Sequence, residues 1–211
     1  GHREIAEYLY DIVEEAYPEE LGTPLHAAAG LGDVELMSKL LDGGYDVDTR
    51  NFRDATPLHW AAGPKQCLLC QIILEKSQAA RTHGLPSSFE RADMGKAIMF
   101  LLERGADREA RDKENNTPLL MAMEWGQKEA AKTLIECNCN VNATDNTGWT
   151  PVLLAAAGGR MEILKKLLER GAALDSVQEG RNALYYARHH GKKVTADFLL
   201  KHGMDANGIG K

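Results

Sequence analysis

The sequence is poor in the features that mark secreted and membrane proteins. It has four cysteines in 211 residues, too few for the disulfide framework of a small secreted domain. No apolar run approaches the roughly 20 residues that a membrane-spanning helix needs. The first residues, Gly1-His2-Arg3-Glu4-Ile5, show no signal-peptide pattern. We therefore expect an intracellular protein, cytoplasmic or nuclear, without membrane insertion.

Long basic blocks and the short motifs of common enzyme classes are also missing. The formal net charge is −6 at pH 7, which argues against nucleic acid or an anionic membrane as the main partner. The sequence contains no P-loop, no G-x-S-x-G, no H-E-x-x-H and no dinucleotide-type glycine pattern. We expect no catalytic residues, no cofactor and no metal, and hence no enzymatic activity within these residues.

What the sequence does have is an internal repeat. The segment Thr23-Pro24-Leu25-His26-Ala27-Ala28-Ala29 recurs in four later copies, which begin at Thr56, Thr117, Thr150 and Asn182. The starts are 33, 61, 33 and 32 residues apart, and 61 is one period plus 28. A second block with apolar residues at helical spacing follows each start, as in Gly159 to Leu168. The period predicts a stack of helical hairpins.

Each position in the repeat start has a physical role. The Thr can cap free backbone N–H groups at a helix start, and the Pro after it fits the first helical position, where no N–H is needed. The small alanines allow neighbouring helices to approach closely, and a Gly about nine residues after the Thr ends the first helix. A single hairpin cannot bury its apolar face alone, so the units must stack.

The pattern resembles the ankyrin-repeat family, whose 33-residue period starts with T-P-L-H-x-A. The resemblance covers nearly the whole chain outside one insertion. It implies an all-α ankyrin-repeat solenoid of stacked helix-turn-helix units with short β-turn fingers, in one domain over residues 1–211. The expected units are a partial repeat at 1–17 and repeats at 18–51, 52–111, 112–144, 145–176 and 177–211.

The repeat at 52–111 carries the 28 additional residues, which we place near 63–92. Two stretches compete to be its second helix, Cys67 to Lys76 and Gly95 to Glu103. Because the later stretch leads directly into the repeat exit Gly105-Ala106-Asp107, we predict the helix there. The chain begins inside a second-helix pattern and ends on a regular repeat exit, so we expect it to be part of a longer array.

The resemblance also implies where a partner would bind. In the family, the contact positions are the finger tips and the first-helix residues four, seven and eight places after the Thr. All three tryptophans fall on this set, and Trp, Tyr and Arg are the residue types that most often anchor interfaces. The alternative for each residue is packing between neighbouring fingers and helices. The predicted protein-binding residues are Phe52, Arg53, Trp60, Arg111, Lys113, Met121, Glu124, Trp125, Asn146, Trp149, Tyr186 and His189.

Two groups of possible ligands have simpler interpretations. His26 and His59 hold the fourth place of T-P-L-H, where we expect them to bond locally and connect adjacent repeats. Cys67-x-x-Cys70 could serve zinc or redox chemistry, but only His59 and His83 are nearby and no βαβ pattern surrounds it. We expect these cysteines to pack in a helix.

Two functions fit these observations. The first is a monomeric protein-interaction module that binds another protein or peptide through its concave face and fingers. The second is a regulatory or substrate-targeting segment of a larger enzyme or effector. The sequence outside these residues would distinguish them, because fold alone does not fix function.

The insertion generates a test of its own. It is either functional or tolerated surface decoration, and our hypothesis is that it enlarges one side of the binding face. Deleting residues 66–91 should then weaken partner binding while circular dichroism reports an intact fold. Unchanged binding by the folded deletion variant would remove the hypothesis.

Overall fold

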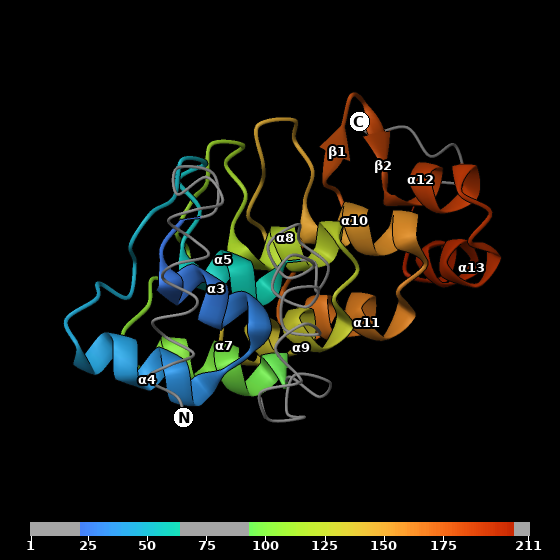
Figure 1. Cartoon of the computed structure of the whole chain (residues 1–211). Helices are drawn as coiled ribbons and strands as arrows, with labels where there is room; N and C mark the ends of the chain where they lie inside the picture. Colours follow the sequence, from blue (N-terminus) through green and yellow to red (C-terminus); the bar gives the residue numbers. More distant parts are fainter. Residues whose placement is uncertain (1–21, 64–92, 205–211) are drawn as a thin grey trace, which may run out of the picture. The chain divides into compact units, whose positions relative to one another are not determined.

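The computed structural model describes residues 22–63 and 93–204 (Figure 1). The chain divides into two compact units, Gly1–Lys113 (unit 1) and Glu114–Lys211 (unit 2). The proposed insertion near 63–92, including Cys67 and Cys70, lies outside the described residues except for Gly63 at its start.

The described residues of unit 1, 22–63 and 93–113, form two helical hairpins. Its described helices are α3 (Pro24–Leu31), α4 (Val34–Asp42), α5 (Pro57–Ala62) and α7 (Met94–Glu103). The first helices α3 and α5 pack side by side, α4 packs on α3, and α7 packs on α5. The helix predicted over residues 95–103 is confirmed by α7, so the exit of this repeat keeps the common register.

Unit 2 contains three hairpins in succession. Its elements are α8 (Pro118–Glu124), α9 (Lys128–Glu136), α10 (Pro151–Gly158), α11 (Met161–Glu169), β1 (Val177–Gln178), β2 (Arg181–Asn182), α12 (Ala183–His189) and α13 (Lys193–Lys201). The first helix α10 lies between α8 and α12, and α11 packs beside α9 (Figure 1). Strands β1 and β2, of two residues each, pair antiparallel and form a finger. The predicted fold class, helical hairpins with short β-turn fingers, is confirmed.

The helices begin where the repeat start predicts. The hydroxyl oxygens of Thr117 and Thr150 accept hydrogen bonds from the backbone N–H groups of Leu120 and Leu153, at 3.2 and 3.3 Å. In each case a proline occupies the first helical turn. These contacts satisfy backbone donors that an α-helix leaves unpaired at its start. Six- to eight-residue first helices are thereby held in place locally as well as by packing.

Alanines and leucines form the core between first helices. In unit 1, Leu25, Ala28 and Leu58 are fully buried, and in unit 2 Leu119, Ala122 and Ala155 are likewise inaccessible. The small alanine side chains allow the close approach that α3 with α5, and α10 with α12, display. Short helices of this kind depend on such packing, because isolated helices below about 12 residues are marginal in water.

His26 connects two consecutive repeats of unit 1. Its side chain is fully buried. Its Nδ1 accepts the backbone N–H of Thr23 at 3.0 Å, so the neutral ring carries its proton on Nε2, which donates to the carbonyl of Ala55 at 2.9 Å. Burial lowers the pKa of His26 to about 4, against a smaller opposing effect of the bond to Ala55. The prediction that this histidine bonds locally and connects repeats is confirmed.

His59 repeats the local half of this arrangement. It is also fully buried, and its Nδ1 accepts the backbone N–H of Thr56 at 3.2 Å. Both histidines are therefore interior hydrogen-bonding groups of the repeat start.

The buried neutral His26 predicts a pH-dependent stability. An unfolded histidine protonates near pH 6.5, whereas folded His26 does so only near pH 4. Between these values the unfolded state binds more protons, so the free energy of unfolding falls as the pH falls, by at most about 3 kcal/mol. Urea unfolding of the wild type at pH 7, 5.5 and 4.5 should show this loss.

The matched variant is His26→Gln, whose amide can accept from Thr23 and donate to Ala55 but does not titrate in this range. The variant should start less stable and lose less stability than the wild type between pH 7 and 4.5. An equal loss in both proteins would contradict the assignment to His26.

Candidate functional site

An aromatic ring flanked by two cations lies on the fingers of unit 1. Phe52 is 43% exposed. The guanidinium carbon of Arg53 lies 5.5 Å from the centre of its ring, and the ammonium of Lys113 lies 5.9 Å from it. The backbone N–H of Lys113 donates to the carbonyl of Arg53 at 2.9 Å. We call Phe52, Arg53 and Lys113 the finger patch.

The finger patch stands on an internally bonded turn. The Asn51 side-chain carbonyl accepts the backbone N–H groups of Arg53 and Ala55, both at 3.0 Å. Arg50 donates from Nη1 to the carbonyls of Asp54 and Arg111, at 3.0 and 2.8 Å. Arg111, a predicted contact residue, is half-buried and its backbone serves this bridge. The turn therefore presents Phe52 from a fixed backbone.

A second candidate surface lies on the first helices of unit 2. Trp125, the residue that follows α8, is 55% exposed. Glu124 beside it is exposed, and Met121, one turn earlier, is half-buried. We call Met121, Glu124 and Trp125 the Trp125 face. The sequence predicted all three, and the structure places them together at one end of α8.

The backbone beneath Trp125 is held by a residue from the next repeat. Arg160 Nη1 donates a hydrogen bond to the carbonyl of Met123 in the last turn of α8. A cation at this end of a helix is favourable, because the helix leaves unpaired carbonyls there. Burial lowers the pKa of Arg160, consistent with its position between repeats. Two glycines, Gly126 and Gly158, make room for it: a Cβ would lie 3.1 Å and 2.9 Å from its side chain, respectively.

The other two tryptophans take part in packing. Trp149 is half-buried, and its ring lies 4.6 Å from that of Tyr186, centre to centre. Trp60 is half-buried too, with the His26 ring edge-on at 5.7 Å. For both tryptophans, the sequence left packing between neighbouring repeats as the alternative to partner binding, and such packing buries part of each side chain.

The structure corrects the prediction for Tyr186. Its side chain is only 6% exposed, because Trp149 covers the ring and the hydroxyl is engaged. The hydroxyl donates to the backbone carbonyl of Gln178 at 3.3 Å and contacts the side-chain carbonyl of the same residue. Tyr186 ties the β1–β2 finger to α12 rather than offering a surface to a partner.

Tyr185 is the residue that sequence reasoning missed. It is half-buried, its ring stacks on His189 at 5.7 Å with an interplanar angle of 9°, and the guanidinium of Arg181 lies 4.8 Å from its centre. We call Arg181, Tyr185 and His189 the Tyr185 ladder. These residues are spaced four apart in the sequence, and this spacing could have indicated that their side chains lie next to one another.

Asn146 completes the predicted set. It is exposed in the finger before α10, and its backbone N–H donates to the carbonyl of Glu114 at 3.0 Å. The turn is closed by Asp145 Oδ1, which accepts from the backbone N–H groups of Thr147 and Trp149 at 2.8 and 2.9 Å.

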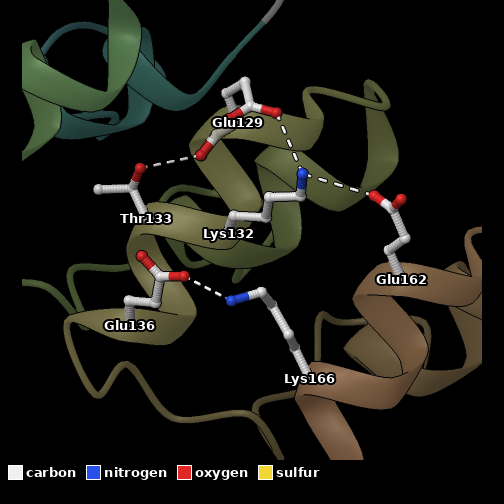
Figure 2. Close-up of polar contacts among 6 residues, drawn as sticks. All are labelled: Glu129, Lys132, Thr133, Glu136, Glu162 and Lys166. Carbon is white, nitrogen blue, oxygen red and sulfur yellow. Dashed lines mark hydrogen bonds and ion pairs between the residues drawn. The ribbon is translucent and has the colours of Figure 1, made fainter.

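The second helices of unit 2 carry charges that pair within the molecule (Figure 2). Lys132 of α9 lies 3.3 Å from Glu129 and 3.4 Å from Glu162 of α11, and Lys166 lies 2.5 Å from Glu136. These contacts raise the pKa of Lys132 and lower that of Glu136. Exposed pairs of this kind each contribute little to stability, but they partly satisfy the charges of this face internally.

The described residues contain neither a metal cluster nor a membrane-spanning helix. Within residues 22–63 and 93–204, no cluster of three His, Cys, Asp or Glu side chains could hold a metal ion. In the same ranges, no helix is long and apolar enough to cross a membrane. The Cys67-x-x-Cys70 pair and His83 lie outside the described residues.

Comparisons with known proteins agree with this architecture. A family model described as ankyrin repeats matches at residues 1–82, 90–145 and 137–209. The probable 26S proteasome regulatory subunit p28 of Saccharomyces cerevisiae is 30% identical over 132 residues, covering 57% of this chain and 57% of that protein. Ankyrin repeat and SOCS box protein 11 of Danio rerio is 33% identical over 122 residues, covering 56% and 42%.

A shorter match is stronger in identity. Protein phosphatase 1 regulatory subunit 12A of Mus musculus is 39% identical over 54 residues, covering 26% of this chain and 5% of that protein. The chain thus spans less than two thirds of each of these relatives.

The contact between Arg160 and Gly158 generates a stability test. Ala in place of a helical Gly ordinarily stabilises by about 0.5–1 kcal/mol. Here the new Cβ would lie 2.9 Å from Arg160 Nε, so Gly158→Ala should instead destabilise, by about 1 kcal/mol. In an Arg160→Ala background the same substitution should stabilise. Urea unfolding of the four proteins of this cycle measures the coupling, and additive effects would show that Arg160 does not occupy the space over Gly158.

Proposed function

The chain belongs to the ankyrin-repeat family, and from this premise we propose that it binds a partner protein through the Trp125 face and the finger patch. Ankyrin repeats are protein-interaction modules. The two surfaces belong to different units, and each is proposed by itself.

The observation that carries the proposal is the exposure of Trp125. More than half of a large aromatic side chain faces solvent, on a helix end that Arg160 holds in place. Removal of such a ring from water is the largest contribution a single residue makes to an interface. A backbone already held in place loses little conformational entropy on binding. Trp125 therefore has the properties of an interface anchor.

The finger patch supports the same function in unit 1. Its exposed Phe52 lies beside the charges of Arg53 and Lys113, and aromatic residues and Arg are enriched at interfaces. In unit 2, Asn146 and His189 are further predicted protein-binding residues with exposed side chains. The half-buried residues Trp60, Arg111 and Trp149 would contribute their exposed edges.

The alternative function is a regulatory or substrate-targeting segment of a larger protein. It is favoured by the names of two relatives, a proteasome regulatory subunit and a phosphatase regulatory subunit. The two functions use the same surface and differ in what else the full-length protein contains. In either case, we propose a monomeric, intracellular chain without catalytic residues of its own.

Trp125→Ala tests the proposal. Because the ring is mostly exposed, the free energy of unfolding should change by less than about 1 kcal/mol. Partner affinity should fall at least tenfold, as expected for an anchor residue worth about 1.4 kcal/mol or more. Affinity capture with wild-type and variant chains, followed by quantitative mass spectrometry and titration of the captured partner, measures the second effect.

Trp149→Ala is the matched control. Its ring packs on Tyr186, so its removal should lower stability by about 2 kcal/mol, and by more than it lowers partner binding in the folded protein. A Trp125→Ala chain that retains every partner at wild-type affinity would sink the proposal.

A further inference from the structure

The Tyr185 ladder occupies a place that is interior in the preceding repeats of unit 2. Tyr185 stands three residues after the helix-start Asn182, as Leu120 and Leu153 stand three residues after Thr117 and Thr150. Leu120 and Leu153 are fully buried, whereas Tyr185 is half-buried. The Tyr185 ring thus lies at a position where the earlier repeats pack against their neighbours.

The ladder is held rigidly from beneath. The Asn182 side-chain oxygen accepts the backbone N–H of Tyr185 at 3.1 Å and caps α12. The ring of Tyr186 meets that of Tyr185 edge-on at 5.4 Å, and the hydroxyl of Tyr186 holds Gln178 of the finger. Arg181 lies on the second strand of that finger. Strand and helix are therefore locked together, and the three groups of the ladder are preorganised.

The segment that bears the ladder is basic, although the whole chain is acidic. The chain carries a net charge of −6. Residues 181–204 nevertheless contain one acidic residue, Asp197, and five basic ones: Arg181, Arg188, Lys192, Lys193 and Lys201. The ladder has an acidic contact with Glu179, whose carboxylate lies 3.7 Å from Arg181, and both side chains are about half exposed or more. A pair this long and exposed is weak, so an incoming carboxylate can replace it.

We propose that the Tyr185 ladder docks an acidic peptide segment of the partner protein. The inference rests on the proposed function and names the chemistry of one part of the bound partner. An Asp or Glu carboxylate pairs with the guanidinium fork of Arg181, which matches carboxylate geometry. The adjoining apolar stem packs along the exposed edges of Tyr185 and His189.

A peptide fits these observations better than a nucleic acid. A protein that binds nucleic acid neutralises several phosphates along a basic stripe, whereas the ladder has one guanidinium beside two rings. The net negative charge of the whole chain would also repel a long polyanion. A short acidic segment needs only the local charge.

The experiment uses the 211-residue chain and a phage-displayed library of random dodecapeptides. Retained peptides are synthesised and titrated by fluorescence anisotropy against the wild type, Arg181→Gln, Tyr185→Leu and Trp125→Ala. Lys128→Gln is the matched control, because it also removes one exposed positive charge but lies on α9, away from the ladder. Thermal unfolding verifies that all variants are folded.

The expected result is an excess of Asp and Glu in the retained peptides. Arg181→Gln should weaken their binding at least fivefold and Tyr185→Leu at least threefold, whereas Lys128→Gln should change it less than twofold. Raising the salt concentration from 50 to 300 mM should also weaken binding.

Three outcomes would overturn the inference. Retained peptides that depend on Trp125 but show no acidic excess would remove it and leave the proposed function standing. Equal or tighter binding of a 12-nucleotide single-stranded DNA would replace the acidic peptide with polyanions in general. A chain that retains no peptide above the background of the library would count against both this inference and the proposed function.

Discussion

The structure depends on one constraint: a helical hairpin of this size cannot bury its own apolar face, so each repeat must be fixed to the next. The described residues meet it with hydrogen bonds between repeats as well as with packing. In unit 1, His26 donates to the carbonyl of Ala55 one repeat later, and the Asp48 carboxylate accepts the backbone N–H of Asp107 at 3.0 Å. In unit 2, Asn142 takes the place of Asp48. Its amide both accepts from Ala173 at 2.8 Å and donates to the carbonyl of Gly171 at 3.2 Å. The repeats are therefore joined through main-chain groups, independently of which side chains face solvent.

Because these bonds leave the solvent-facing side chains free to vary, the faces of the molecule can differ in chemistry. In unit 2 the second helices pair Lys132 and Lys166 with carboxylates of their own and adjacent repeats. On the first helices, by contrast, Trp125 stands exposed. Exposed hydrophobic residues are common on protein surfaces when they occur singly. What distinguishes Trp125 is the turn of α8 just before it. The Met123 carbonyl in that turn accepts a hydrogen bond from Arg160 of the next repeat.

The register of the repeats could be predicted from the sequence, but the burial of individual aromatic rings could not. Thr117 and Thr150 begin helices where the period placed them, and α7 lies where the Gly105-Ala106-Asp107 exit required. The family's contact positions nevertheless included Tyr186 and His189 of α12 but not Tyr185. Tyr186 is buried because Trp149, 37 residues earlier, lies on its ring, and a period does not report contacts between rings of adjacent repeats. Tyr185 lies outside those positions, and the same place is interior in α8 and α10. The candidate site could thus be located by spacing to the correct helices and fingers, but the contacts made by each ring had to come from the fold.

The residue before each second helix differs between the two units. In one unit it caps its own helix, and in the other it can contact the preceding repeat. In unit 1 this residue is Asp33 or Asp93, and its carboxylate caps its own helix, at 3.0 and 3.2 Å from a backbone N–H. Such a cap is worth about 1 kcal/mol. In unit 2 the same place is held by Gln127 before α9, Arg160 before α11 and Lys192 before α13, and none of the three provides a side-chain cap. Instead, Arg160 reaches back to the last turn of α8, and the stem of Lys192 lies over Gly159 at the end of α10. The repeats of α11 and α13 thus lack a side-chain cap on the second helix, and each instead has a side-chain contact to the preceding repeat. At α8 that contact is to the carbonyl of Met123, two residues before Trp125, so the residue that couples the repeats also holds the end of the helix that bears the exposed ring.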